Sequence, residues 1–368
     1  MKNFILILLT LTAFLLLFPM IITAQNEITD DIVIVWTEPW FEEIARSLLA
    51  KPTGDITVGE FGSIGAININ LYGNGEINYN VQDLIFGHTK SELPITSIHD
   101  LRYFTNLISL SCTGITLTNP NEFSELKNLE ILTIYDNNDA ANYIEPLSKL
   151  EYLIEFQVQN LKITELPGYE NLKWLQNINL SSYEELAVVH TFKNMPDLTR
   201  IGISFSDVED TEISQLDFSG FSELDKISTL HIALDNPQAI IAFQNSDLTP
   251  FSKMPELTVM YVEDNSYTDF PYDTSHLSAL TNLTSLYIVK ANISDISFIQ
   301  KLKDLSSFIA ILSYKSNITD VSALLSLEKL EVICINPLNE DVDLRNFVRL
   351  HTLVLDGTEI SYTSDIEY

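Results

Sequence analysis

The sequence predicts an α/β fold: a right-handed solenoid with a parallel β-sheet on its concave face and a 3₁₀-helical or irregular convex side. Two observations predict this fold class. An apolar ladder recurs eleven times between Leu101 and Leu355, and periodic self-similarity of this kind is typical of solenoids. An amphipathic segment, Thr37 to Thr57, precedes the ladder and predicts a small N-terminal helical cap.

Each copy of the ladder has five positions, separated by steps of 3, 3, 3 and 2 residues, and all are apolar except Ser313 at the end of one copy. The first copy comprises Leu101, Phe104, Leu107, Leu110 and Cys112. The final step of 2 predicts a β-strand, and the steps of 3 predict a helical or 3₁₀ return. We call the fourth position the marker; it falls at residues 110, 132, 156, 178, 201, 230, 260, 286, 311, 333 and 353. These spacings of 20 to 30 residues are those of leucine-rich repeats, which stack to share one core.

The predicted cap is a single amphipathic helix. Thr37 can cap its first turn, and Pro39 suits the first helical position. Pro52 and Gly54 end the helix. The apolar face of the helix comprises Phe41, Ile44, Ala45 and Leu48. We expect this face to cover the open edge of the first strand, because an exposed edge invites aggregation.

Between the cap and the ladder the pattern is weaker. A degenerate first repeat has one alternating strand, with Ile67, Ile69 and Leu71 facing inward. Leu84 and Phe86 are candidates for one more strand, within a stretch, residues 75–94, that the pattern places only loosely.

The chain divides into four predicted segments. Residues 1–24 are expected to be a signal peptide, because a long apolar run ends in a small-residue site before Gln25. An uncleaved membrane anchor is the alternative, since the run is long enough to span a bilayer. The other segments are the helical cap at 25–65, the solenoid at 66–361 and a C-terminal tail at 362–368. The protein is therefore expected to be secreted, extracellular or held at the cell surface.

Two late repeats share a motif just after their strands, Ile293-Ser294-Asp295-Ile296 and Ile318-Thr319-Asp320-Val321. Asp295 and Asp320 would turn the chain by accepting hydrogen bonds from nearby backbone N–H groups. Together with the ladder and the N-terminal helical stretch, this motif makes the chain resemble the internalin-like bacterial leucine-rich-repeat proteins. The resemblance covers most of the chain after residue 24. It implies a secreted or cell-surface interaction protein and names no partner.

The chain departs from that family pattern in several places. Members of the family usually have an asparagine five residues after the marker, which ties neighbouring coils together, but only Asn137 and Asn265 retain it here. A weak polar ladder between the coils is therefore expected. No immunoglobulin-like module or wall-sorting motif follows the repeats, which argues against a covalent wall anchor and a host-invasion role. Two long repeats contain insertions, Asp207–Glu212 and Asn236–Gln238. These insertions are either chance variation in loop length or loops that contribute to binding.

Acidic residues greatly outnumber basic ones, 51 against 20, and the formal net charge is −31. Such a chain repels phosphate backbones and anionic lipids, which excludes nucleic acid as a partner. A membrane remains a partner only if the N-terminal segment is uncleaved. The charge either serves solubility or attracts a cationic protein partner.

The middle residue of each predicted strand points to the concave face. This column is small and polar in the first half of the solenoid and aromatic or apolar in the second. Because contiguous exposed apolar surface usually marks an interaction site, we predict that an unidentified protein binds a patch comprising Tyr261, Tyr287, Leu312, Tyr314 and Val354. Two alternatives remain: these residues merely favour strands, or the poorly capped C-terminal end self-associates.

Nothing in the sequence indicates an enzyme, a cofactor or a metal site. The six histidines have no metal-ligand spacing, and no phosphate loop or nucleophile elbow is present. Cys112 and Cys334 lie nine repeats apart, roughly 40 Å at about 4.8 Å per strand, too far for a disulfide. The alternative to protein binding is a structural or carbohydrate-binding role in the cell envelope.

Overall fold

The computed structural model describes residues 30–61, 64, 67–81, 84–135, 144–158, 172–181, 195, 197–205, 215–266, 270–336, 352–355 and 358–361. The predicted signal peptide, the predicted C-terminal tail and the predicted insertion at 207–212 lie outside the described residues. Within the described ranges, no helix is both long and apolar enough to cross a membrane.

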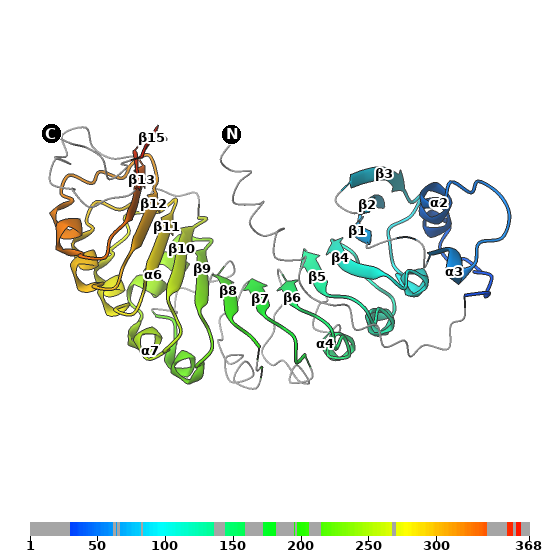
Figure 1. The fold of residues 1–368 in the computed structure, drawn as a ribbon, viewed down its shortest axis with the longest axis horizontal. Helices are drawn as coiled ribbons and strands as arrows, with labels where there is room; N and C mark the ends of the chain where they lie inside the picture. Colours follow the sequence, from blue (N-terminus) through cyan, green and yellow to red (C-terminus); the bar gives the residue numbers. More distant parts are fainter. Residues whose placement is uncertain are drawn as a thin grey trace.

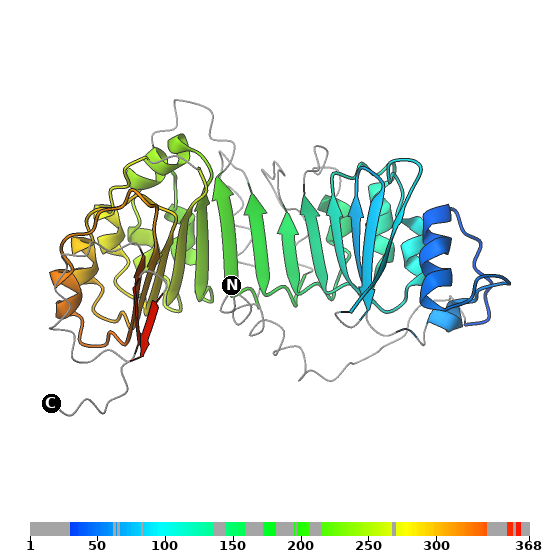
Figure 2. The same cartoon turned by 90° about the horizontal axis from the view of Figure 1, so that it is seen from above.

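One 15-stranded sheet runs through the molecule, in the order β15 to β4 and then β1, β2 and β3. Figures 1 and 2 show that the strands line the inner side of an arch and that the helical segments lie outside it. The strands are β1 (Ile67–Tyr72), β2 (Glu76–Val81), β3 (Leu84–Lys90), β4 (Leu107–Thr113), β5 (Ile131–Tyr135), β6 (Glu155–Val158), β7 (Asn177–Ser181), β8 (Arg200–Phe205), β9 (Thr229–Leu234), β10 (Val259–Asp264), β11 (Ser285–Val289), β12 (Ser307–Ile311), β13 (Val332–Asn336), β14 (Thr352–Leu355) and β15 (Thr358–Ser361).

Short helices form the described part of the convex side, as the steps of 3 in the ladder predict. They are η2 (His99–Tyr103), η3 (Pro120–Glu125), α4 (Ile144–Leu147), η7 (Ser219–Glu223), α6 (Pro237–Gln244), α7 (Thr249–Ser252), η8 (Ser275–Ala279), η9 (Ser297–Lys301) and η10 (Ser322–Ser326). The predicted turns at Asp295 and Asp320 are confirmed: their carboxylates accept hydrogen bonds from the backbone N–H of Ser297 (2.7 Å) and Ser322 (2.8 Å).

The strand register confirms the predicted fold class and most of the ladder. Strands β1 and β4 to β14 pair in parallel, and marker faces marker from Leu110 and Leu132 onward. The described inward positions are buried, Cys112 among them. Each coil therefore buries its apolar edge against its neighbours, which is why a single repeat of this kind is not stable by itself.

The marker predicted at residue 311 is wrong. Phe308 pairs with Leu286 of β11 and with Ile333 of β13, and it is fully buried, so Phe308 is the marker of this repeat. Ile311 is 47% exposed. In this repeat the apolar residues continue in steps of 3 from Phe308 to Ile311, so either residue could be the marker on sequence grounds. The pairing with the two neighbouring strands decides between them.

The N-terminal cap comprises α2 (Pro39–Leu48) and α3 (Val58–Phe61). Phe41, Ile44 and Ala45 of the predicted apolar face are fully buried. Rings from the two helices pack on Phe104 of the first full repeat, with centroid distances of 4.5 Å to both Phe41 and Phe61. The cap therefore closes the apolar end of the solenoid core.

The helix does not cover the edge of the first strand, contrary to the prediction. Strands β2 and β3 extend the sheet beyond β1 in antiparallel pairs, and Leu84 begins β3 as the sequence suggested. A strand edge presents backbone N–H and C=O groups, which a hairpin can pair and an apolar helix face cannot. The turn between β1 and β2 places Gly75 at φ +83°, which favours glycine.

The prediction that the Thr37 side chain caps α2 is also wrong. The residue preceding α2 is Glu38, and no side chain from the local sequence caps the helix. The Asp100 carboxylate, from η2, accepts hydrogen bonds from the backbone N–H of Thr37 and of Glu38, both at 2.8 Å. The hydroxyl of Thr37 donates to the same carboxylate. The cap helix is thus held from a repeat 63 residues away.

Side-chain hydrogen bonds between neighbouring coils occur at a different position of the repeat from that of the family asparagine. At the position of the family asparagine, Ile115 and Ala291 are buried apolar residues, in agreement with the predicted loss of that ladder. Asparagines four residues before the marker replace it in part. The Asn106 and Asn128 side chains donate to carbonyls of the preceding coil, and Asn282 donates to three carbonyls, those of Phe251, Met254 and Leu257.

Replacement of Asn282 by alanine is expected to destabilise the protein by about 1–2 kcal/mol, because three carbonyls of the preceding coil lose their side-chain donor. Urea denaturation followed by circular dichroism measures the loss. Asn121→Ala, at an exposed position, is the matched control and should change stability by less than about 0.5 kcal/mol. Equal stability of the two variants would show that Asn282 does not tie the coils together.

The predicted insertion at Asn236–Gln238 begins helix α6. The Asn236 side chain caps this helix by accepting a hydrogen bond from the backbone N–H of Ala239 at 2.8 Å. Ala239, Ile240 and Phe243 are fully buried, so the insertion adds a packed helix to the solenoid.

Candidate functional site

The register of the parallel strands brings the concave column together as the sequence predicts. His231, Tyr261 and Tyr287 occupy equivalent positions of β9, β10 and β11. The following strands place Ile309 and Cys334 beside them. The backbone of Val354 pairs with Cys334 in β14, and the side chain of Val354 lies outside the described residues.

Two residues of the predicted patch lie elsewhere. Leu312 follows the end of β12 and is buried at 8% exposure, so it does not face the concavity as a strand residue. Tyr314 lies in the turn after β12, where it is 79% exposed and its ring lies beneath the Lys315 ammonium. Both assignments followed from the shifted marker, and Ile309 takes the position that was predicted for Leu312.

The two predicted tyrosines form the centre of the site. The rings of Tyr261 and Tyr287 stack with centroids 4.2 Å apart and planes 14° from parallel, and the His231 ring lies edge-on to Tyr261 at 5.8 Å. Burial, reinforced by the neighbouring Tyr287, raises the pKa of Tyr261 to about 12. The phenol therefore stays protonated at physiological pH and can donate a hydrogen bond.

A fixed polar group borders the stacked rings. The Glu263 carboxylate lies 3.3 Å from His231 Nε2 and 2.7 Å from Lys290 Nζ. The hydrogen bond with His231, followed by that with Lys290, lowers the pKa of Glu263 to about 2 despite partial burial. Lys290 Nζ also donates to Asn265 Oδ1 at 2.7 Å. This cluster was not predicted, because only the strand register brings its members together.

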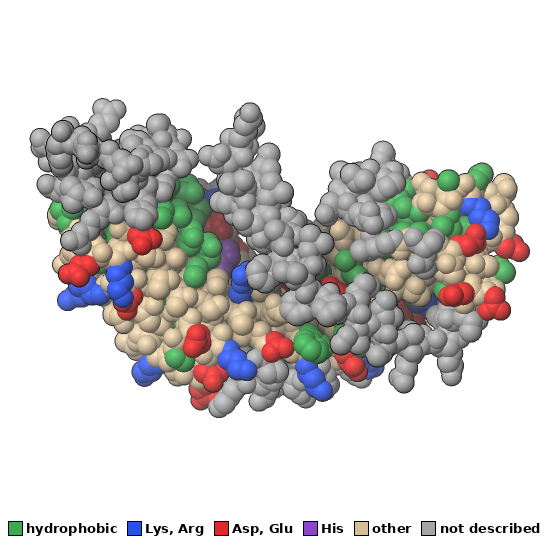
Figure 3. All heavy atoms as spheres, viewed as in Figure 1, with side chains coloured by type: hydrophobic (Ala, Val, Ile, Leu, Met, Phe, Trp, Pro, Cys, Tyr) green, Lys and Arg blue, Asp and Glu red, His purple; other side chains and the backbone are tan. Residues whose placement is uncertain are grey.

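Aliphatic side chains continue the surface beyond the tyrosines. Ile309 of β12 lies beside Tyr287. Two residues further along these strands, at the next positions that face the concavity, Val289 of β11 pairs with Ile311 of β12. Figure 3 shows hydrophobic side chains gathered on this part of the concavity. We call this surface the tyrosine patch and define it as Tyr261, Tyr287, Val289, Ile309 and Ile311.

The first half of the concave face is polar, as predicted. Ser111, Thr133 and Gln157 occupy the middle column there. Gln157 accepts a hydrogen bond from the Tyr135 hydroxyl at 3.0 Å and donates one to Glu155 at 2.6 Å. The tyrosine patch is therefore confined to the C-terminal half of the described face.

The acidic excess of the chain is not found on the concave face. Along the described strands β4 to β13, the concave-facing positions hold Glu155, Arg200 and Glu263 as their charged side chains, together with His231. The net charge of −31 therefore resides elsewhere on the chain, and the electrostatics of this face are set by a few individual side chains.

The remaining reactive residues are not grouped. Cys112 is fully buried in the core, Cys334 is partly buried on the concave face, and both are free thiols. Burial raises the pKa of each thiol. In the described part of the chain, no group of three or more His, Cys, Asp or Glu side chains is placed to hold a metal ion.

The fold is similar to that of known bacterial proteins. No family model matches the sequence, and no curated protein shows significant similarity to it. The structure of an internalin, InlF of Listeria monocytogenes, aligns with a TM-score of 0.51 and 19% identity, covering 88% of this chain and 83% of that chain. Internalin C2 of the same species aligns over 56% of this chain and 83% of its own, with 22% identity and a TM-score of 0.37. The chain thus has the leucine-rich-repeat solenoid fold that is seen in the internalin InlF.

Proposed function

We propose that this chain is a secreted or cell-surface interaction protein that binds a protein partner through the tyrosine patch. The observation that supports the proposal most strongly is the run of half-buried stacked tyrosines and aliphatic side chains, ending at the exposed Ile311, on a concave face whose first half has a polar middle column. Apolar surface of this kind usually marks an interaction site. Tyrosine suits such a site, because it combines a large contact area with a polar tip.

The geometry of the stack favours a protein over a carbohydrate. Sugars are commonly bound against an open aromatic face, but the two faces of Tyr261 are covered by Tyr287 and by the edge-on His231 ring. The stack therefore presents ring edges and hydroxyl groups to a partner. These groups suit the apolar side chains and backbone carbonyls of a protein segment.

The fold and the predicted leader support the proposed location. The internalin-type solenoid is a scaffold for extended binding surfaces. The apolar segment at residues 1–24 would direct the chain out of the cytoplasm. A protein of this type needs no catalytic group, and we propose no enzymatic activity.

The proposal is tested by probing protein arrays and glycan arrays with three proteins: the wild type, the double variant Tyr261→Ala/Tyr287→Ala, and Trp174→Ala. Trp174 is an exposed aromatic residue in the turn before β7, so its replacement is the matched control. We expect saturable binding to a protein target, weakened at least tenfold in the double variant and unchanged in Trp174→Ala, since buried aromatic anchors dominate interface energetics.

Two outcomes would refute the proposal. One is a protein target that binds the double variant as tightly as the wild type. The other is saturable binding to glycans alone, which would favour the carbohydrate-binding alternative.

A further inference from the structure

Arg200 is a cation on the concave face that has no partner among the described residues. It begins β8, level with Asn177 of β7 and Thr229 of β9, and its side chain is exposed. Its guanidinium has no ion-pair or hydrogen-bond partner in the part of the chain that the structure describes. Other described basic side chains, such as those of Arg46 and Lys329, contact carboxylates at 2.6 and 2.5 Å.

The guanidinium of Arg200 interacts electrostatically with Tyr261 of the tyrosine patch. Burial raises the pKa of Tyr261, and the positive charge of Arg200 opposes that rise, so the guanidinium and the phenol lie within electrostatic reach of each other. The strand register also places Arg200 close to the tyrosine patch. Arg200 pairs with Thr229 of β9, which pairs with Val259 of β10, two residues before Tyr261. On the other side of the tyrosines, the side chains of His231 and Lys290 both contact the Glu263 carboxylate.

An amide side chain lies on the strand next to that of Arg200. Gly202, two residues after Arg200, occupies the middle column, and the side chain of Asn179 from β7 lies above it: an added Cβ at Gly202 would be 1.7 Å from Asn179 Oδ1. The absence of a side chain at residue 202 therefore leaves room for the exposed amide of Asn179, which lies on the adjacent strand two positions along from Arg200. A guanidinium and an amide together offer several N–H donors and suit the oxygens of a carboxylate.

We propose that Arg200 binds a carboxylate of the partner protein while the tyrosine patch contacts apolar side chains next to that carboxylate. The inference rests on the proposed function and specifies its partner. The contact segment of the partner contains Asp or Glu beside apolar residues, and it is not the cationic segment that the overall charge suggests.

A single arginine can favour partners that carry a carboxylate. Arginine forms bidentate hydrogen bonds with carboxylates and is common among residues that dominate interfaces. Desolvation of an unpaired guanidinium is costly, so a partner that covers the patch without supplying a carboxylate would be disfavoured. Nucleic acid would supply phosphates instead, but the net charge of −31 on the whole chain repels a polyanion.

A random peptide library, panned against purified wild-type protein, against Arg200→Ala and against Arg200→Glu, tests the inference. We expect the wild type to enrich peptides with Asp or Glu beside apolar residues. Arg200→Ala should lose the preference for acidic residues, and Arg200→Glu should enrich Lys or Arg instead. Lys301→Ala, an exposed residue of η9 on the convex side, is the control and should select the same peptides as the wild type.

Affinities of the best wild-type peptide complete the test. Exchange of its Glu or Asp for Gln or Asn should weaken binding to the wild type at least tenfold and leave binding to Arg200→Ala unchanged. If the exchange has no effect but Tyr261→Ala/Tyr287→Ala abolishes binding, this inference is overturned and the proposed function stands. If the double variant binds the peptide normally, or if no peptide is enriched on the wild type, both are overturned.

Discussion

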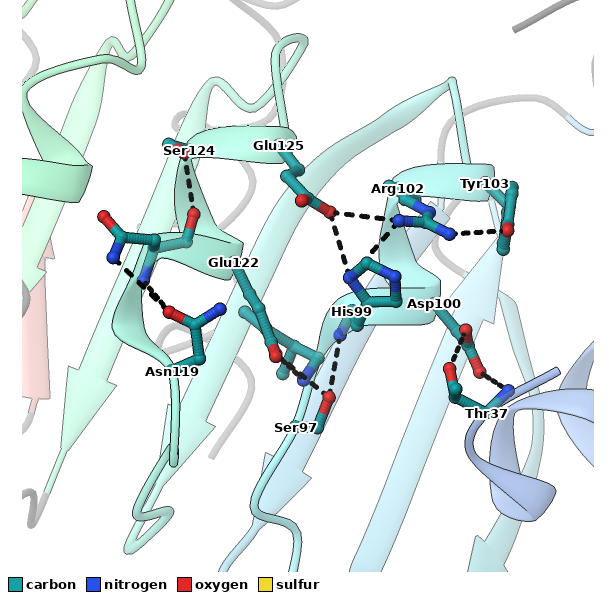
Figure 4. A network of polar contacts seen from close by, with 12 residues as sticks. Thr37, Ser97, His99, Asp100, Arg102, Tyr103, Asn119, Glu122, Ser124 and Glu125 are labelled. Carbon is teal, nitrogen blue, oxygen red and sulfur yellow. Dashed lines mark hydrogen bonds and ion pairs between the residues drawn. The ribbon is translucent and has the colours of Figure 1, made fainter.

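Replacement of Asp100 by alanine should destabilise the protein by about 2–4 kcal/mol, because two backbone N–H groups and a hydroxyl lose a charged acceptor that is itself buried. The side chain is completely buried, and its bonds to Thr37 and Glu38 join the first repeat to the start of α2. Figure 4 shows the carboxylate directed at this segment. The carboxylate also lies at the N-terminus of α2, where the helix dipole favours negative charge.

The same arrangement recurs one repeat later, which strengthens the expectation. Glu122 occupies the position equivalent to Asp100, immediately before the first ladder residue of its repeat. It is also buried, and it accepts hydrogen bonds from the backbone N–H of Ile98 at 2.6 Å and from the Ser97 hydroxyl at 3.0 Å. Buried carboxylates at this position thus connect the first two full repeats to the segments before them (Figure 4).

The tryptophans provide a selective readout. Trp36 and Trp40 belong to the cap and Trp174 lies outside it, so a Trp174→Phe background reports the cap alone. Chemical denaturation of Asp100→Ala should shift the fluorescence transition at least as far as the transition seen by circular dichroism. Asp304→Ala, which removes an exposed carboxylate paired with Lys329, is the control and should change stability by less than about 1 kcal/mol. A similarly small change in Asp100→Ala would mean that Asp100 does not hold the cap.

Replacement of His276 by phenylalanine should increase stability, and the increase should be largest in mild acid. The imidazole packs against both Phe243 and Tyr272, with ring centroids at 5.1 and 5.9 Å. Neither ring nitrogen has a hydrogen bond of good geometry among the described residues; a backbone group of Asp273 is its nearest polar contact. Burial lowers the pKa of His276 from its ordinary value of 6.5 to about 4, and the nearby Asp273 opposes this shift only in part. Phenylalanine fills the same aromatic site without unpaired nitrogens.

The sign of the pH dependence follows from the lowered pKa. Because the unfolded chain takes up the proton more readily, the contribution of the neutral imidazole is complete above pH 6.5 and is lost as the pH falls towards 4. The wild type should therefore lose about 2 kcal/mol relative to His276→Phe between pH 7.5 and pH 5. Urea denaturation at several pH values measures this difference.

Other titrating groups also change the stability of the protein with pH, so the wild type must be compared with the His276→Phe variant. Burial raises the pKa of Glu38, Glu130 and Asp264, and these carboxyl groups add stability as the pH falls. The difference between wild type and variant cancels their contribution. Tyr272→Phe, which removes a buried hydroxyl without a described partner, is the control and should keep the pH dependence of the wild type. Parallel pH curves for the wild type and His276→Phe would contradict the prediction.

The sequence predicted the parts of the fold that repeat locally. The steps of 3 and 2 record which side chains face inward, and this pattern depends only on the geometry of strands and 3₁₀ turns. It therefore identified the solenoid, the cap helix and the tyrosines at 261 and 287. It failed at Phe308, where apolar residues continue in steps of 3 and two frames fit, so that Leu312 and Tyr314 were assigned to the patch and Ile309 was missed.

The sequence by itself thus determined the coil and most of its concave column, because each repeat carries its own inward pattern. Only the tertiary structure decided which residues meet between coils. Asp100 reaches a helix 63 residues away, Glu263 joins His231 and Lys290 from separate strands, and Arg200 remains without a described partner near Tyr261. These relations depend on the register between coils, and no local periodicity in the sequence records that register.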